Sequence, residues 1–197
     1  MDSTFVPIGS DKVRHWARSR GLGYDPRPNE RWFREWEPFD MLTSPAAYLN
    51  ACSWNANPGS ATIVEPWTED GLTEPMDRTI FAFVRHPNLV HRASMRAGES
   101  FVTRVAFLSD PPPPEQKVGE PRWDDNTCTR AASVGEAQAA FTPTLRTLLR
   151  RWGFQGHLEL KPGGLLLYFV DLKATPDHYD AMMQRIPMVV NAALTPG

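Results

Sequence analysis

Three arginines give the clearest indication of chemistry in this sequence. Arg92, Arg96 and Arg104 lie on either side of Gly98, where a hairpin turn is expected. A hairpin symmetric about Gly98 places Arg92 opposite Arg104, and like charges directly opposed across two strands destabilise the pair unless an anion lies between them. The pattern predicts either an anion-binding site, with His91 close to it, or guanidinium groups that extend into solvent or meet acidic side chains elsewhere.

The cysteines and histidines show no nucleophile or metal-ligand motif. Cys52 and Cys128 lack metal-ligand spacing to each other and to the five histidines. The segment 161–164, Lys-Pro-Gly-Gly, lacks the Gly-Lys-Ser/Thr of a phosphate-binding loop and is typical of a turn. We therefore expect no catalytic residue, no metal and no cofactor, although a ligand at the arginine hairpin leaves an enzyme open as the alternative.

A short aromatic helix is the second candidate site. Asn29 can cap a helix that carries Trp32, Phe33 and Trp36 before Pro38 ends it. Three large aromatic side chains do not hide easily on a helix of about two turns, and exposed aromatic patches mark interfaces. We predict a surface that binds another protein or a second copy of this chain. The alternative is that the helix is buried against a sheet.

Composition excludes several broad classes of function. The formal net charge of −2 and the pI near 6.2 give no basic field of the kind that nonspecific nucleic-acid binding requires. The longest apolar run, Leu165 to Val170, is far too short to span a membrane. No apolar stretch near the start is long enough for a signal peptide, and two cysteines in 197 residues favour a reduced, cytoplasmic setting.

The last third of the chain predicts helix, strand, glycine turn, strand and helix. Thr142-Pro143 is a capped helix start, and Gly153 stands where a left-handed C-terminal cap belongs. Alternation predicts a strand over 157–161, and the unbroken apolar run over 165–170 predicts a central strand covered on both faces. A second Thr-Pro pair opens the last helix, which Pro187 is expected to kink or break.

The middle of the chain predicts an antiparallel sheet built from short strands. These strands are Tyr48–Trp54, Ala61–Trp67, Thr79–Val84, Leu89–Met95, Phe101–Leu108 and Asn126–Ala132. The proline-rich segment 110–119 is expected to form an exposed, extended connector. The fold class is therefore α+β, one domain over 1–197, with an antiparallel sheet, helices packed mainly on one face and a C-terminal helix-hairpin-helix unit.

Two stretches are similar to parts of an uncharacterised group of bacterial proteins that has no assigned activity. They are Trp16–Tyr24 (WARSRGLGY) and Leu145–Leu165, the latter with LRTLLRRWGF, GHLEL and GGL. Both motifs are structural, a capped helix before a strand and a helix before a hairpin. Members often carry an N-terminal membrane anchor, and we expect none here, because residues 1–10 hold no long apolar stretch. The resemblance implies a bacterial, non-enzymatic α+β domain and transfers no catalytic residue.

Two hypotheses follow from these observations. The first is a non-enzymatic protein-binding or assembly module in a bacterial cytoplasmic complex, with another protein or itself as partner. The second is a small anionic-ligand-binding protein or enzyme that uses the Arg92/Arg104 hairpin.

Overall fold

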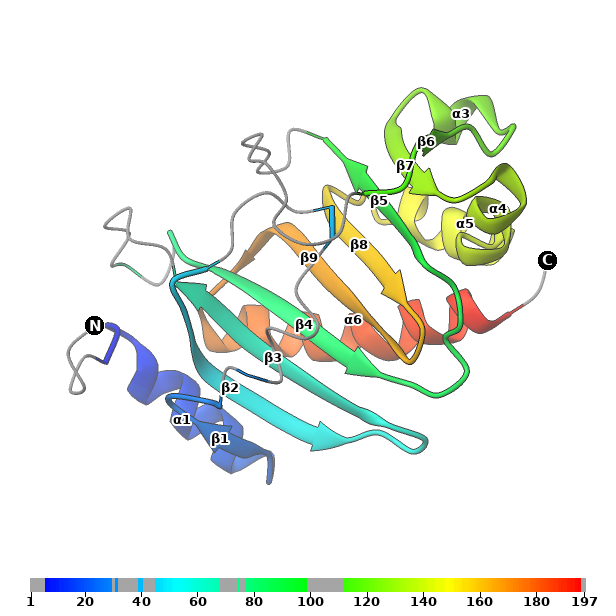
Figure 1. Ribbon diagram of the computed structural model, residues 1–197. Helices are drawn as coiled ribbons and strands as arrows, with labels where there is room; N and C mark the ends of the chain where they lie inside the picture. Colours follow the sequence, from blue (N-terminus) through cyan, green and yellow to red (C-terminus); the bar gives the residue numbers. More distant parts are fainter. Residues whose placement is uncertain are drawn as a thin grey trace.

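One antiparallel sheet runs through the protein (Figure 1). The structure is a computed structural model that describes residues 6–29, 31, 39–40, 45–67, 74, 77–98 and 112–195. Nine strands of this part of the chain pair in the order β1-β2-β3-β4-β9-β8-β5-β7-β6. Their bounds are Gly23–Asp25 (β1), Ala47–Asn55 (β2), Ser60–Trp67 (β3), Thr79–Arg85 (β4), Ala93–Ala97 (β5), Glu115–Gln116 (β6), Thr127–Ala131 (β7), Gly156–Lys161 (β8) and Gly164–Lys173 (β9).

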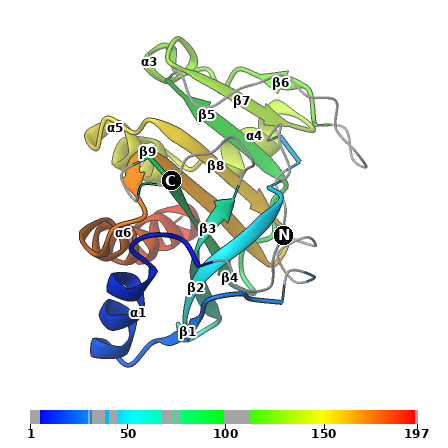
Figure 2. The same ribbon diagram turned by 90° about the vertical axis from the view of Figure 1, so that its left-hand side faces the viewer.

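The described helices pack on one face of this sheet. They are α1 (Ser10–Ser19), α3 (Pro121–Asp124), α4 (Val134–Ala140), α5 (Pro143–Arg151) and α6 (Pro176–Leu194). Figure 2 shows α1, α5 and α6 together on the same side. Each helix contributes buried residues to one main core, from Val13 of α1 to Val190 of α6. The α+β fold with an antiparallel sheet is therefore confirmed.

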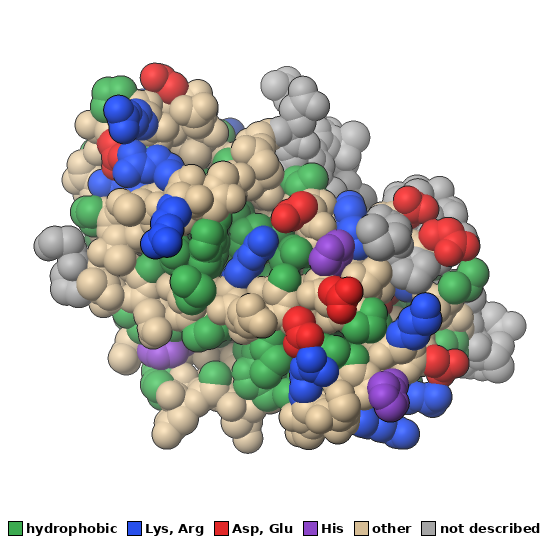
Figure 3. All heavy atoms as spheres, turned by 180° about the vertical axis from the view of Figure 1, so that it is seen from behind, with side chains coloured by type: hydrophobic (Ala, Val, Ile, Leu, Met, Phe, Trp, Pro, Cys, Tyr) green, Lys and Arg blue, Asp and Glu red, His purple; other side chains and the backbone are tan. Residues whose placement is uncertain are grey.

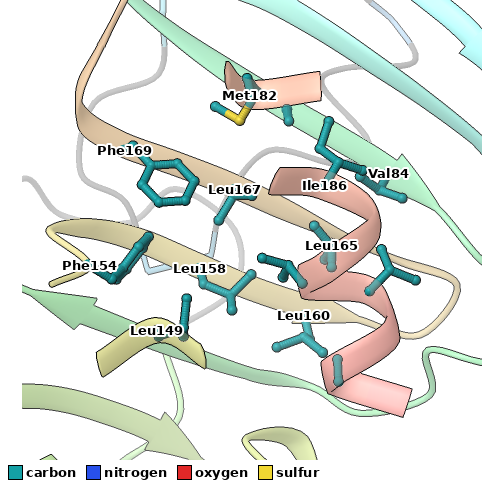
Figure 4. Packing of buried hydrophobic residues seen from close by; sticks show 14 of the residues in the cluster. Val84, Leu149, Phe154, Leu158, Leu160, Leu165, Leu167, Phe169, Met182 and Ile186 are labelled. Carbon is teal, nitrogen blue, oxygen red and sulfur yellow. The ribbon is translucent and has the colours of Figure 1, made fainter. Parts of the chain in front are cut away.

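The central strand β9 is buried on both faces, as its sequence predicted. Leu165, Leu167 and Phe169 belong to the main core, whereas the alternate residues Leu166 and Tyr168 belong to a separate buried cluster. Figure 4 shows the first set beside side chains of β8 and α6. Full burial of one such side chain contributes about 1.5–3 kcal/mol, so this layer holds the sheet and α6 together.

The structure also confirms the helix start and the C-terminal cap that the sequence predicted for α5. The Oγ1 atom of Thr142 accepts a hydrogen bond from the amide of Leu145 at 3.2 Å, and Pro143 occupies the first helical position. Trp152 closes the helix, and Gly153 follows in the left-handed conformation with φ 58°. The helix from Thr142 to Gly153 is confirmed at both ends.

The prediction of a hairpin around Gly98 is wrong, because both edges of β5 pair with other strands. One edge of β5 pairs with β8 and the other with β7, so that Met95 lies opposite both Leu158 and Thr129. Neither edge is left to pair with residues 101–108, which lie outside the described residues. The side-chain pattern was right, because Ala93 and Met95 do face the main core.

Two further expectations are corrected. Pro187 does not break α6, which continues on both sides of it, because the buried residues Ile186, Val189 and Val190 hold the helix on the sheet and offset the roughly 3 kcal/mol cost of an interior proline. The proline-rich segment is not a plain exposed connector, since its residues 115–116 form β6 against β7 and Val118 is buried.

Candidate functional site

The structure places two of the three predicted anion-binding arginines close to aromatic or acidic groups. The Nε atom of Arg96 lies 3.4 Å from Oδ2 of Asp40, and the guanidinium carbon of Arg92 lies 4.3 Å from the ring centroid of Phe39. Arg96 therefore already has a counter-charge. Arg104 lies outside the described residues, so an anion-binding role shared with Arg92 stays a prediction, but the hairpin that was expected to oppose the two arginines does not form at β5.

The predicted aromatic surface is not described either. Trp32, Phe33 and Trp36 lie outside the described residues, and their role in partner binding stays a prediction. The expected helix cap has some support, because the side-chain oxygen of Asn29 accepts a hydrogen bond from the amide of Arg31 at 3.0 Å.

A buried acid organises the polar side chains that point away from the helices on β5 and β7. Asp40 is 3% exposed and accepts a hydrogen bond from the hydroxyl of Ser94 at 2.7 Å. Arg96 and Arg130 approach its two carboxylate oxygens at 3.4 and 3.3 Å. Two cations therefore compensate the charge of Asp40, although the Nε atoms of Arg96 and Arg130 are buried and make no hydrogen bond in the described part of the chain.

A second buried acid, Glu159 of β8, lies on the same face. Its carboxylate accepts hydrogen bonds from the backbone amides of Phe39 and Asp40 at 2.8 and 3.2 Å, and Nε2 of His157 lies 3.2 Å away. His157 thus contacts Glu159, while Ser94 donates to Asp40. This division differs from a Ser-His-acid relay, in which the histidine must contact the serine hydroxyl.

A fully buried ion pair lies under α1 and α6. Oε2 of Glu65 accepts from Nε of Arg78 at 2.9 Å, and Oε1 accepts from Nδ2 of Asn50 at 2.9 Å and from the hydroxyl of Tyr179 at 3.2 Å. Burial raises the pKa of Glu65, and the charge of Arg78 opposes that rise. The cluster joins β2, β3 and α6, so its role is structural.

An apolar pocket of about 360 Å³ opens between α3, α5 and the ends of β5 and β7. We call it the α3–α5 pocket. Its lining residues are Met95, Ala97, Arg122, Trp123, Asn126, Thr127, Leu149, Arg150, Gly153, Phe154 and Gln155. Figure 4 shows two of its apolar walls, Leu149 and Phe154, beside Leu158 of β8. Sequence reasoning missed this site.

The short helix α3 is fixed by an acidic side chain and a tryptophan. The carboxylate of Asp124 accepts hydrogen bonds from the amides of Val118, Gly119 and Glu120 at 2.9, 3.0 and 3.1 Å. The indole of Trp123 is buried, and its Nε1 donates to Oγ1 of Thr129 at 2.9 Å. The pocket wall is therefore held rigidly. Glu120-Pro121, with proline at the first helical position, was the sequence signal that could have revealed α3.

A second surface feature lies along the seam between α5 and α6. We call Leu148, Arg151 and Trp152 of the α5 segment, with Arg185 and Met188 of α6, the α5–α6 surface. The guanidinium carbon of Arg185 lies 5.8 Å from the ring centroid of Trp152, and Met188 is 47% exposed. Figure 3 shows hydrophobic side chains gathered in the middle of this side of the molecule, with Lys and Arg side chains beside them and over the α3–α5 end.

Neither a metal cluster nor a membrane-spanning helix is found in the described part of the chain. There, no three His, Cys, Asp or Glu side chains lie close enough together to hold a metal ion. Among the described helices, none is both long enough and apolar enough to cross a membrane.

Comparison with known proteins identifies a fold and no family. No family model matches this chain, and no curated protein does. The crystal structure of the mycobacterial trehalose monomycolate transport factor A, TtfA, matches with a TM-score of 0.62 at 10% sequence identity, over 95% of this chain and 97% of that one. At this identity the likeness concerns the fold alone: the chain has an α+β architecture similar to that of TtfA over nearly its full length.

Proposed function

We propose that this chain is a non-enzymatic protein-binding or assembly module of a bacterial cytoplasmic complex, and that it contacts its partner through the α5–α6 surface. The observation on which the proposal rests is the combination of a half-buried Trp152, an exposed Met188 and Arg185, whose guanidinium stacks on Phe169 at 4.3 Å and lies 5.8 Å from the Trp152 ring. Tryptophan, arginine and methionine are enriched at interfaces, and tryptophan and arginine most often dominate their binding energy.

The geometry of the seam explains why these side chains form one patch. The hydroxyl of Thr142 donates to the carbonyl of Ala192 at 2.7 Å and fixes the start of α5 against the end of α6. At the other end, Trp152 meets Arg185. Met188 follows Arg185 by three residues and lies on the same side of α6. A partner therefore meets an apolar strip that is already held in shape, which lowers the entropy lost on binding.

The charge along the seam indicates what kind of partner fits. Arg151 is exposed and has no ion pair among the described residues, and Arg185 has only the distant Asp171, 3.8 Å away and 66% exposed. Cations near the end of α5 are also favoured by the helix dipole. The surface is thus apolar with a basic margin. It suits a partner segment with apolar side chains flanked by Asp or Glu.

Two further observations support the proposed bacterial cytoplasmic setting. The resemblance to a bacterial group without assigned activity and the scarcity of cysteines both favour a bacterial cytoplasmic role. The description of TtfA names a transport process and no reaction, which is compatible with a protein that works by contact.

The test compares two exposed apolar side chains. A complex is first isolated from the source cells and its partner purified. Binding is then measured for the wild type, for Met188→Asp and for the control Val134→Asp, whose residue on α4 is 44% exposed. We expect Met188→Asp to weaken binding at least about tenfold and Val134→Asp to leave it unchanged. Equal binding by both variants would contradict the proposal. Self-association that Met188→Asp abolishes would identify the partner as a second copy.

A further inference from the structure

We infer that the α3–α5 pocket binds a small amphiphilic anion, a molecule with an apolar body and a carboxylate or phosphate head. This site is separate from the α5–α6 surface, and it is independent of the function proposed there. The pocket volume of about 360 Å³ falls within the range of small-molecule sites, roughly 300–1,000 Å³.

The inner part of the pocket is apolar. Met95, Leu149 and Phe154 line it, and each is at most 6% exposed. Trp123 adds an aromatic wall whose polar atom is already used, because its indole Nε1 donates to Thr129. An apolar wall without unpaired donors favours hydrocarbon or aromatic groups over water or polar ligands.

The small side chain of Ala97 explains why space remains. Ala97 ends β5 and lines the pocket together with Leu149 and Phe154, so a larger side chain at this position would take up part of the space. Its neighbour Met95 is fully buried in the main core. The opening therefore lies at the end of the strand, where the sheet stops and α3 and α5 form the walls.

The mouth of the pocket is cationic. Two of the lining side chains are arginines, Arg122 and Arg150, and none is acidic. Arg150 is paired with Glu120, which also holds Arg146 at 2.7 Å, so two arginines share one carboxylate. Arg122 is exposed, and its guanidinium has no ion pair among the described residues. Arg122 therefore offers a ligand a positive charge that no described carboxylate neutralises.

Arginine is suited to this use. Its planar guanidinium offers paired N–H donors that match a carboxylate or phosphate head in a bidentate manner. The side-chain amides of Asn126 and Gln155 also line the pocket and offer neutral donors, of which one N–H of Asn126 is already used on the carbonyl of Arg122 at 3.0 Å. The apolar body then fills the interior, and the head stays at the mouth beside Arg122.

The first experiment uses decanoate and its uncharged analogue decanol as probes, with binding measured by calorimetry. Variants are Arg122→Gln and the control Arg151→Gln, since Arg151 is exposed on α5 but does not line the pocket. We expect Arg122→Gln to weaken decanoate binding roughly tenfold while leaving decanol unchanged, and Arg151→Gln to change neither. Absence of decanoate binding to the wild type, or equal losses in both variants, would overturn the inference.

A second measurement locates the probe and separates this site from the proposed partner surface. Methyl NMR with labelled methionine should show decanoate shifting the Met95 signal, in the pocket, and leaving the Met188 signal, on the α5–α6 surface, in place. Ala97→Leu should fill the space and remove the shift. A shift of Met188 alone would overturn the pocket site, whereas failure of partner binding in Met188→Asp would not affect it.

A third measurement distinguishes a free amphiphile from a lipid headgroup. Vesicles of phosphatidylcholine with and without phosphatidylglycerol are sedimented with the wild type and with Arg122→Gln. Binding of decanoate without vesicle binding would assign the site to free amphiphiles. Vesicle binding that needs phosphatidylglycerol and is lost in Arg122→Gln would assign it to lipid headgroups. Binding of neither probe refutes the site.

Discussion

Replacing Arg78 with methionine tests the physical account of the buried ion pair most directly. In the wild type, the side chains of Arg78 and Glu65 are 3% and 0% exposed, and a 2.9 Å bond joins them. The methionine keeps most of the side-chain length and removes the cation, so Glu65 stays buried without its counter-charge. Breaking a buried pair in this way typically costs about 3–5 kcal/mol.

The loss of stability should depend on pH, because a protonated Glu65 carries no charge and needs no counter-ion. Burial already raises the pKa of Glu65 above its ordinary value of 4.5, and Arg78 is the main group that limits the rise. Without Arg78 the pKa rises further. Between 4.5 and that raised pKa the folded state holds a proton that the unfolded state has released. Within that window the free energy of unfolding falls by up to about 1.4 kcal/mol per pH unit.

Urea denaturation between pH 4.5 and 8 measures this slope. At pH 4.5 the free energy of unfolding of Arg78→Met should be close to that of the wild type. As the pH rises, it should fall below the wild-type value. The wild type should show the same trend over a narrower range. Adding Glu65→Gln to Arg78→Met should remove the slope, since glutamine cannot titrate. The control is Arg20→Met, which breaks a pair with Asp180 that is about one-third exposed and is worth at most about 1 kcal/mol.

Parallel stability curves for Arg78→Met and for the Arg78→Met/Glu65→Gln double variant would refute the reasoning. They would mean that Glu65 does not change its proton occupancy on unfolding. A loss in Arg20→Met as large as that in Arg78→Met would also refute it, because burial would then have no bearing on the cost.

Two further predictions concern a thiol and a helix cap. Burial raises the pKa of Cys52 to about 12, so we expect Cys52 to resist Ellman's reagent at pH 8 in the native protein and to react in urea; rapid reaction of both cysteines in the native state would contradict this. Thr142→Ala removes the cap on Leu145 and the buried bond to Ala192 and should cost about 2 kcal/mol in urea denaturation, while Thr142→Ser retains most of the stability. Equal losses in the two variants would show that the hydroxyl is not what stabilises the helix start.

The parts of the fold that the sequence predicts are those whose signals are local. The caps at Thr142 and Gly153 involve atoms a few residues apart, and so does the turn between β8 and β9. The burial of β9 on both faces follows from six consecutive apolar residues, which need no knowledge of their neighbours. Such features depend on propensity and periodicity alone.

The partners of β5 were not predictable in the same way. The alternation of Ala93, Met95 and Ala97 shows which side chains face the core, and the structure agrees. It says nothing about which strand lies alongside. A glycine after a strand favours a local hairpin, but β5 pairs with β7 and β8, which follow it by roughly 30 and 60 residues. Burial in the centre of a sheet outweighed the local turn signal.

The α3–α5 pocket lies at the junction of segments that are far apart in sequence, and this is why no motif indicates it. Its floor comes from β5, its wall from α3 and its far side from α5 and Phe154. None of these segments is unusual alone: Arg122 resembles any exposed helix cation, and Ala97 any small strand residue. Only the pairing of β5 with β7 and β8 brings the short side chain of Ala97 into one pocket with Leu149 and Arg122. Chemistry at this position therefore depends on strand order, which periodicity does not encode.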